Sequence, residues 1–202
     1  MTAPITTAVT ICNSALLKMG ADKISSLSQT TRAAVLCNTL YYILRDEVMG
    51  AAPWKFAKKR AVLTPTSTTP AFTYSYEYDI PSDCLRLLQS DDTALVWVQE
   101  GTKILSNESS LNMIYLYRNE DESSWDARFC EALSWRLAME LALCLTQSTT
   151  MKQEAEKSYN ATLSLARATN AVIGAQPVLE ADTWSDARRG NNRWRTAIGR
   201  IS

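Results

Sequence analysis

The sequence contains no histidine, and this absence excludes several kinds of chemistry at once. Histidine is a frequent general base in enzymes and a frequent metal ligand, and it activates the nucleophile of many serine and cysteine hydrolases. Glycine is also scarce, with six residues, and none of them forms the GxGxxG or GxxxxGK(S/T) spacing of a phosphate-binding loop. We therefore expect a protein that is not an enzyme, with no catalytic residues, no cofactor and no bound metal.

The five cysteines lack the features of a reactive or metal-binding set. Their number is odd, no two have CxxC spacing, and the sequence offers no histidine to activate a thiolate. All but Cys84 fall in apolar stretches with helical periodicity. We therefore expect free thiols in a reducing compartment. The five are Cys12, Cys37, Cys84, Cys130 and Cys144.

Long hydrophobic runs and targeting signals are also missing. The first residues, MTAPITTAV, have neither the basic start nor the long apolar core of a signal peptide. No apolar run approaches the ~18 residues that are needed to cross a bilayer. We expect a soluble protein that is made in a cytoplasm and makes no membrane contact.

Two acidic clusters, Asp91–Asp92 and Glu120–Glu122, are candidates for binding a cation. Neither cluster has the alternating oxygen-ligand spacing of a calcium loop. We interpret them as solvated charges, one in a turn and the other at the start of a helix.

Positive and negative charges balance, with 21 residues of each sign, but they are unevenly distributed. From Arg188 onward the chain has five arginines and no acidic residue, which leaves 16 basic residues against 21 acidic ones elsewhere. An acidic body with a basic end suggests that this end binds another molecule.

The basic end also contains two tryptophans, and tryptophan and arginine are enriched at the energetic centres of protein–protein interfaces. We therefore predict a protein-binding arm. Two alternatives are open from the sequence, because the arginines could instead bind DNA phosphates or the segment could be disordered. The candidate residues are Trp184, Arg188, Arg189, Arg193, Trp194, Arg195 and Ile198.

Four stretches repeat apolar residues with the 3.6-residue period of an amphipathic helix. The third is apolar on nearly every side, which predicts that it is the central helix, and the first two are expected to pair antiparallel. Gly50 and Pro53 are expected to end the second helix. The stretches run from Thr6 or Thr7 to Gly20, from about Thr31 to Gly50, from Asp121–Ser124 to about Thr146, and from about Thr149 to Val172.

The region between the second and third helices is rich in Thr, Tyr, Val and Pro, which is typical of strands and turns. Phe72–Tyr78 has an aromatic residue at every second position, so these side chains should share one face of a strand. The stretch VQEGTKIL has the pattern of a hairpin. These features predict a small antiparallel sheet inserted between helices. Its other strands are expected at Cys84–Leu88, Ala94–Gln99, Lys103–Ser106 and Met113–Tyr117.

Together these patterns predict an α+β protein, mainly a helical bundle of about four helices, with a small inserted antiparallel β lobe and an extended C-terminal arm. The sequence contains no internal repeat and no low-complexity segment. The expected divisions are residues 1–54 for the first half of the bundle, 55–120 for the β-rich insertion, 121–174 for the second half of the bundle, and 175–202 for the arm.

A basic cluster lies at the start of the insertion, beside two aromatic residues. Basic and aromatic side chains together can bind a nucleic-acid backbone, so this cluster could face DNA. We favour a different interpretation, in which Trp54 and Phe56 point the same way from a strand into the core while the basic residues point into water. The cluster consists of Lys55, Lys58, Lys59 and Arg60.

The segment PWKFAKKRAVL, Pro53–Leu63, and the helix before it carry a family resemblance. That helix has an alanine-rich start with a cysteine, a tyrosine-rich middle and an Arg-Asp-Glu exit. In this pattern, over roughly its first two-thirds, the chain resembles the tail tubular protein A family of short-tailed bacteriophages.

The resemblance implies a structural virion protein of the phage neck or tail, made in the host cytoplasm. Proteins of this family are head-to-tail adaptors that form a ring of twelve subunits between the portal protein and the tail nozzle. The ring extends the channel through which DNA passes during ejection, without sequence-specific binding.

Carried over to this chain, the resemblance implies that the bundle makes the ring contacts, the arm binds the portal, and the β lobe faces the nozzle or the tail fibres. The alternative function is a DNA-binding or packaging-associated module. Such a module would use the basic arm and the Lys55–Arg60 cluster.

Overall fold

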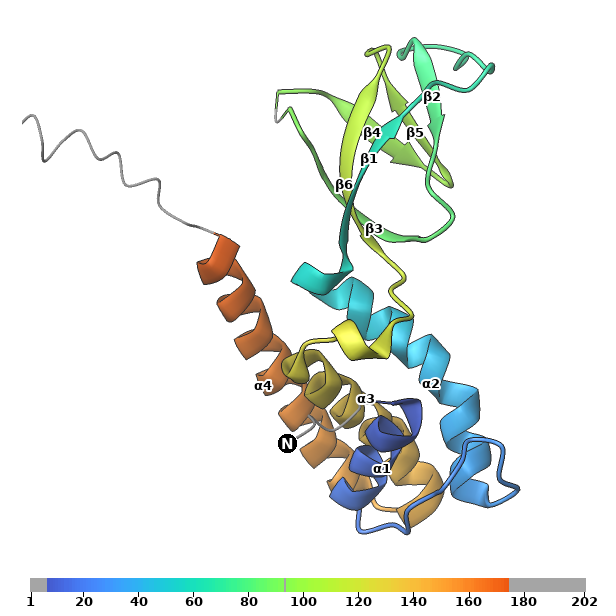
Figure 1. Cartoon of the computed structure of the whole chain (residues 1–202), viewed down its shortest axis with the longest axis vertical. Coiled ribbons are helices and arrows are strands. Elements are labelled where there is room, and N and C mark those ends of the chain that lie inside the picture. The colour runs from blue at the N-terminus through green and yellow to red at the C-terminus, as the bar shows by residue number, and fades with distance from the viewer. Residues whose placement is uncertain (1–6, 93, 175–202) are drawn as a thin grey trace, which may run out of the picture. The chain divides into compact units, whose positions relative to one another are not determined.

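The computed structural model describes residues 7–92 and 94–174 of the chain. The chain divides into two units, Met1–Asn170 and Ala171–Ser202, and all the described strands lie in the first unit. Within the described residues the protein is α+β, with four α-helices and two small antiparallel sheets of three strands each (Figure 1). The α+β class is therefore confirmed, whereas the predicted single sheet is in fact two sheets.

Along the described part of the chain, all six strands lie between the second and third α-helices. The helices are α1 (Ala8–Lys18), α2 (Arg32–Ala51), α3 (Ala127–Thr146) and α4 (Thr149–Gly174), with two short 3-10 helices, η1 (Lys55–Ala57) and η2 (Glu122–Ser124). The strands are β1 (Lys58–Leu63), β2 (Tyr76–Asp79), β3 (Cys84–Ser90), β4 (Trp97–Glu100), β5 (Lys103–Ser106) and β6 (Leu111–Tyr117).

Threonine caps begin the first two helices. The Thr7 hydroxyl accepts a hydrogen bond from the Thr10 amide, and the Thr10 hydroxyl accepts one from the Thr7 amide at 2.8 Å, which completes a capping box. The Thr31 hydroxyl accepts a hydrogen bond from the Ala34 amide at 3.4 Å at the start of α2. Both helix starts lie where the sequence predicted them.

The end of α2 is set by Pro53 and not by Gly50. The helix continues through Gly50 to Ala51, and only Ala52 has an extended conformation, with φ −137° and ψ 154°. A proline ring disfavours the helical conformation in the residue before it, so Ala52 cannot extend the helix. The end expected at Gly50 and Pro53 is therefore correct to within one residue, and Pro53 is its cause.

The start of α3 is later than predicted. Asp126 caps the helix by accepting a hydrogen bond from the Arg128 amide at 2.8 Å, and the expected first turn is instead the separate 3-10 helix η2. From Ala127 onward α3 packs along both α1 and α2 and buries apolar residues against them. The buried apolar residues of α3 are Phe129, Ala132, Leu133, Leu137, Ala138, Leu141 and Ala142.

An aromatic cluster lies at the end of the helical core beside η1. The ring centroid of Phe129 is 5.3 Å from that of Trp54 and 5.0 Å from that of Phe56. Trp54 is fully buried, and its indole N–H donates to the carbonyl of Val48 at 2.9 Å. Both aromatic side chains thus pack against the core as expected, but Phe56 does so from η1 and Trp54 from the residue before it, because β1 begins only at Lys58.

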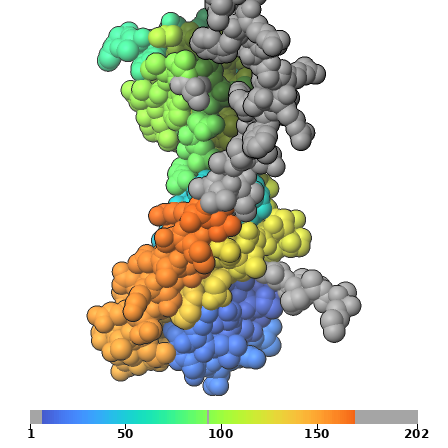
Figure 2. Space-filling view, turned by 90° about the vertical axis from the view of Figure 1, so that its left-hand side faces the viewer, coloured from blue at the N-terminus to red at the C-terminus, as the bar shows by residue number. Residues whose placement is uncertain are grey.

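Helix α4 covers part of the same core. Its buried residues Ala155 and Leu163 belong to the helical core, and near Met151 it lies against α1 and α3. Figure 2 shows this helix in orange beside the blue N-terminal helix. Within the described residues, no helix combines the length and apolar character that crossing a membrane requires.

The β lobe consists of sheet A, with strand order β1-β6-β3, and sheet B, with strand order β2-β5-β4. All paired strands are antiparallel. The two sheets share a second, smaller core, because their inner faces pack against each other. Its buried residues are Leu63, Leu111 and Met113 from sheet A, and Tyr78 and Ile104 from sheet B.

Strand β2 is shorter than predicted. Thr73 has a positive φ of 72°, which turns the chain, and Phe72 is 81% exposed, so these residues do not continue the aromatic face. Only Tyr76 and Tyr78 face the core of the lobe. The predicted hairpin is confirmed, because β4 and β5 are paired and joined through Gly101, whose φ is +59°.

Candidate functional site

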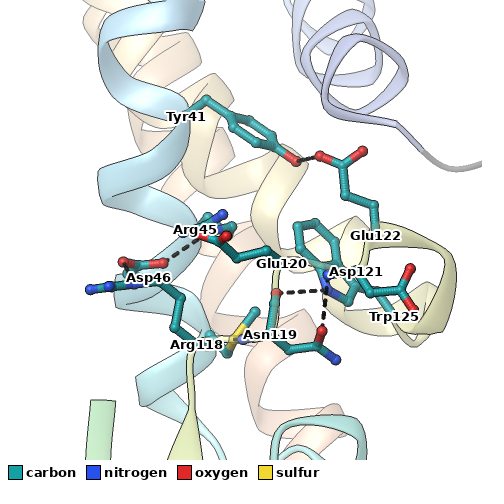
Figure 3. Close-up of polar contacts among 10 residues, drawn as sticks. Tyr41, Arg45, Asp46, Arg118, Asn119, Glu120, Asp121, Glu122 and Trp125 are labelled. Atoms are coloured by element: carbon teal, nitrogen blue, oxygen red, sulfur yellow. Dashed lines mark hydrogen bonds and ion pairs between the residues drawn. The ribbon is translucent and has the colours of Figure 1, made fainter. Parts of the chain in front are cut away.

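A dense polar network surrounds residues Arg118–Trp125, the segment that leaves β6 and enters α3; we call this segment the joint. Figure 3 shows three side chains of α2, those of Tyr41, Arg45 and Asp46, directed toward it. The joint thus connects the β lobe, the helical core and the start of α1 through side-chain contacts.

Asp46 holds two arginines at the joint. Its carboxylate accepts a hydrogen bond from Arg118 Nε at 2.7 Å and another from Arg45 Nε at 2.8 Å. Arg45 is 6% exposed and also reaches Glu120 at 3.4 Å. A buried guanidinium is tolerated only with such partners, so this cluster fixes the end of β6 against α2.

Asn119 links three elements. Its side-chain amide donates to the carbonyl of Phe56 at 3.2 Å and to the hydroxyl of Ser124 at 2.8 Å. The backbone carbonyl of Asn119 accepts a hydrogen bond from the indole of Trp125 at 3.1 Å. Its backbone nitrogen lies 3.3 Å from the sulfur of Met49. The side-chain oxygen of Asn119 also accepts a hydrogen bond from the Asp121 amide at 3.0 Å, so this buried side chain needs both a donor and an acceptor, which asparagine provides.

Glu122 attaches the start of α1 to the joint. One carboxylate oxygen accepts a hydrogen bond from the amide of Ala8 at 2.8 Å, and the other accepts one from the Tyr41 hydroxyl at 2.9 Å (Figure 3). The carboxylate lies at the positive end of the helix dipole of α1. Burial and the neighbouring Glu122 carboxylate raise the pKa of Tyr41 well above its usual value.

The acidic clusters do not converge on one point. In the joint, Glu120 contacts Arg45, Asp121 accepts hydrogen bonds from Ser123, and Glu122 points toward α1. In the turn after β3, Asp91 lies 4.0 Å from Arg60, while Asp92 accepts a hydrogen bond from the Ala94 amide. Over residues 7–92 and 94–174, no group of three or more cysteine or acidic side chains is arranged to hold a metal ion.

The basic cluster at Lys55–Arg60 is divided between different surfaces. Lys55 lies in η1, whereas Lys58 and Arg60 lie on the outer face of sheet A, beside Leu116 and Ile114 in the strand register. Lys59 points to the other side and forms an ion pair with Asp83 at 2.7 Å. All four side chains are exposed, but strand alternation prevents them from forming one continuous patch.

The raised pKa values of Cys12 and Cys130 make these two thiols poorly suited to act as nucleophiles. Burial raises the pKa of Cys130 to about 11, and a hydrogen bond with the neighbouring Cys37 and burial raise the pKa of Cys12 above its usual range. All five cysteines are free, as expected, although only Cys12 and Cys37 are fully buried.

The predicted arm lies outside the described residues, and so do all of its candidate residues. These are Trp184, Arg188, Arg189, Arg193, Trp194, Arg195 and Ile198. The prediction that they bind a partner protein stays a prediction.

The joint was not predicted from the sequence, although one signal was present. Arg45 lies four residues after Tyr41 and four before Met49, which places it on the buried face of α2. A charge on a buried face requires partners, but the sequence does not identify them. In the part of the chain that the structure describes, every buried side-chain nitrogen and oxygen has a hydrogen-bond partner. The joint is therefore a structural connection whose polar groups satisfy one another.

Comparisons with other proteins add no family assignment. No protein-family model matches the chain, and no curated protein is similar to it in sequence. The resemblance to tail tubular protein A rests on the Pro53–Leu63 pattern and stays a prediction.

Proposed function

We propose that this protein is a structural virion protein, a head-to-tail adaptor whose copies form a ring that joins the portal to the tail nozzle and extends the DNA channel. The observation that carries this proposal is the Pro53–Leu63 segment, which resembles the corresponding segment of tail tubular protein A. In this fold the segment begins in the helical core with Trp54 and ends in the lobe core with Leu63. The segment therefore connects the helical part to the β lobe. Such a structural role is consistent with a family pattern that contains no catalytic residue.

The described surface supports a protein whose work is binding other proteins. Large apolar side chains are exposed on α2, at Val35, Tyr42 and Ile43, and on the lobe, at Val62 and Phe72. Val35 and Tyr42 are two helical turns apart and so lie on one face of α2, and contiguous exposed apolar groups can mark a protein–protein interface. An adaptor needs several such contacts at once, with its neighbours in the ring and with the proteins above and below it.

In this proposal the arm after residue 174 contacts the portal through its tryptophans and arginines, and the β lobe faces the nozzle or the tail fibres. The ring would contain twelve subunits, and DNA would pass through it without sequence-specific contacts. The balanced charge of the chain suits such a passage, because a strongly basic channel would retain DNA through its phosphates.

The test is co-sedimentation of the purified protein with the portal ring of its own virus, for the full chain and for a chain truncated after Thr183. We expect the full chain to sediment with the portal in moderate salt and the truncated chain to remain in the supernatant. Binding by both chains would support the adaptor and overturn the role of the arm.

A DNA-binding assay with the same two proteins tests the alternative function. If neither protein binds the portal but the full chain shifts DNA at low salt, the DNA-binding or packaging-associated module replaces the adaptor. A matched control is the full chain with Lys55 and Lys58 changed to Gln, which should bind DNA more weakly only if the basic cluster contributes.

A further inference from the structure

The outer face of sheet A is basic around a small apolar groove. Strand register places Lys58 and Arg60 of β1 beside Leu116 and Ile114 of β6. Arg86 of β3 also pairs with Leu116 and is exposed, whereas Leu116 itself is buried in the helical core. Arg60, Val62 and Ile114 help to line a groove of about 230 Å³, and Val62 is 69% exposed.

Only one acidic side chain among the described residues forms an ion pair with the three cations of this face. It is Asp91, which approaches Arg60 at 4.0 Å, the limit for an ion pair. Lys58 and Arg86 form no ion pair with any described residue. The outer face of sheet A therefore presents three cations against one anion.

The outer face of sheet B has the opposite charge. Register and ion pairs place Glu77 and Asp79 of β2 on this face beside Lys103 of β5, which contacts them at 2.9 and 2.8 Å. Glu100 of β4 pairs with Lys103 in the strand register and forms no ion pair with a described residue. Because the Glu77 side chain is only 16% exposed, the exposed acidic groups on this face are Asp79 and Glu100, against the single cation Lys103.

Apolar groups accompany the charges on sheet B. Val98 lies two residues before Glu100 on the same face and is 38% exposed. Phe72, in the loop before β2, is 81% exposed and borders a hollow lined by Glu77, Glu100 and Lys103. The outer face of sheet B thus has projecting apolar groups among acidic ones.

The two charged faces point away from each other. The inner faces of both sheets meet in the lobe core, where Leu63 and Met113 of sheet A pack with Tyr78 and Ile104 of sheet B. Because side chains alternate along a strand, the outer faces must lie on opposite sides of the lobe.

We propose that the basic outer face of sheet A on one copy of this protein binds the acidic outer face of sheet B on the next copy. Phe72 and Val98 of one lobe would meet the Val62–Ile114 groove of its neighbour, and the surrounding charges would pair. A contact between two different faces of the same molecule repeats from copy to copy and closes into a ring when the rotation permits. This inference rests on the proposed ring. It assigns a contact between ring subunits to the β lobe, whereas the resemblance implies that the helical bundle makes the ring contacts.

Two charge-reversal variants test the contact. In the first, Lys58→Glu and Arg60→Glu make both outer faces acidic; in the second, Asp79→Lys and Glu100→Lys make both basic. We expect the unchanged protein to self-associate at low salt in sedimentation velocity, and each variant alone to associate at least about tenfold more weakly. An equal mixture of the two variants should regain association, because each then meets a neighbour of opposite charge.

Matched controls separate the contact from general charge effects. Lys23→Glu with Lys157→Glu, and Asp22→Lys with Glu156→Lys, make the same charge changes at exposed sites on the helical part, and they should leave self-association unchanged. Circular dichroism should show the same helix content and thermal midpoint for all variants. An unchanged protein that stays monomeric at every concentration and salt, or a mixture that fails to regain association, would overturn the proposal.

Portal binding, measured on the same samples, distinguishes this inference from the proposed function. If the protein binds the portal but charge reversal does not affect self-association, the adaptor stands and the lobe contact is wrong. If the mixture regains association and no sample binds the portal, the lobe contact stands and the adaptor is wrong.

Discussion

The helical part and the β lobe of this protein differ in how they use their apolar residues. Most of the buried hydrophobic residues lie in the helical core, whereas the core of the lobe contains five. Both parts also expose large apolar side chains, such as Ile43 on α2 and Val62 and Phe72 on the lobe. The difference therefore lies in the cores, and the larger helical core is expected to supply most of the stability.

The largest expected effect is on the helical core. Phe129→Ala removes the ring that contacts Trp54, Phe56 and Trp125, so we expect it to lower the free energy of unfolding by about 3–5 kcal/mol. Urea denaturation followed by circular dichroism measures this loss. Phe72→Ala is the matched control, because Phe72 is exposed, and its change should stay within about 0.5 kcal/mol. Equal effects of the two substitutions would contradict the assignment of stability to the helices.

The joint should show the next largest effect. Asp46→Asn leaves the buried Arg45 without its nearest charge and also releases Arg118, so we expect a loss of about 2–3 kcal/mol of stability. Glu120→Gln is the control, since the Glu120 side chain is mostly exposed and its distance to Arg45 is longer. If the control destabilised the protein as much as Asp46→Asn in the same urea titration, the central role of Asp46 would be wrong.

A substitution in the lobe core should destabilise the protein less, and its effect should stay within the lobe. Ile104→Val removes one methyl group from a core of five residues, for an expected loss of about 0.5–1.5 kcal/mol. Native-state hydrogen exchange should show faster exchange in β2, β5 and β6 and unchanged exchange in α2 and α3. Val96→Ala, at an exposed site in the same lobe, should leave both regions unchanged. Faster exchange throughout the helices would show instead that the two parts unfold together.

The same comparison explains how much could be predicted from the sequence. Helices depend on local signals, and the starts expected at Thr6 or Thr7 and at about Thr31 were placed correctly because a threonine before an apolar period is such a signal. The β lobe depends on pairing between distant strands, so the split into two sheets could not be predicted from alternation alone. The turn at Thr73 was missed because a positive φ at a threonine has no sequence signal.

The candidate site was predicted less well than the fold, for a related reason. Glu122 contacts Ala8, which lies 114 residues earlier in the chain, and Asn119 contacts Phe56 across 63 residues. Such contacts appear only when the chain is folded. The basic cluster at Lys55–Arg60 was visible in the sequence, but strand alternation decides which face of the sheet each residue occupies. The acidic partner of Lys59, Asp83, is likewise known only from the folded chain.

The effect of a substitution at Tyr41 is expected to be similarly small at neutral pH, and it depends on pH. Tyr41→Phe removes the hydrogen bond to Glu122, so we expect a loss of about 0.5–1.5 kcal/mol at neutral pH. Burial and the Glu122 carboxylate raise the pKa of Tyr41 in the folded protein, whereas the unfolded chain ionises near its usual value of about 10. Above that pH the unfolded state binds fewer protons than the folded state, so the stability of the unchanged protein falls as pH rises. The phenylalanine variant lacks this loss, and the difference in stability between the two proteins should narrow at alkaline pH.

Urea titrations across the alkaline range, with Tyr42→Phe on the exposed side of α2 as control, measure the difference. A constant difference at all pH values would show that Tyr41 ionises alike in both states and that Glu122 does not act on it.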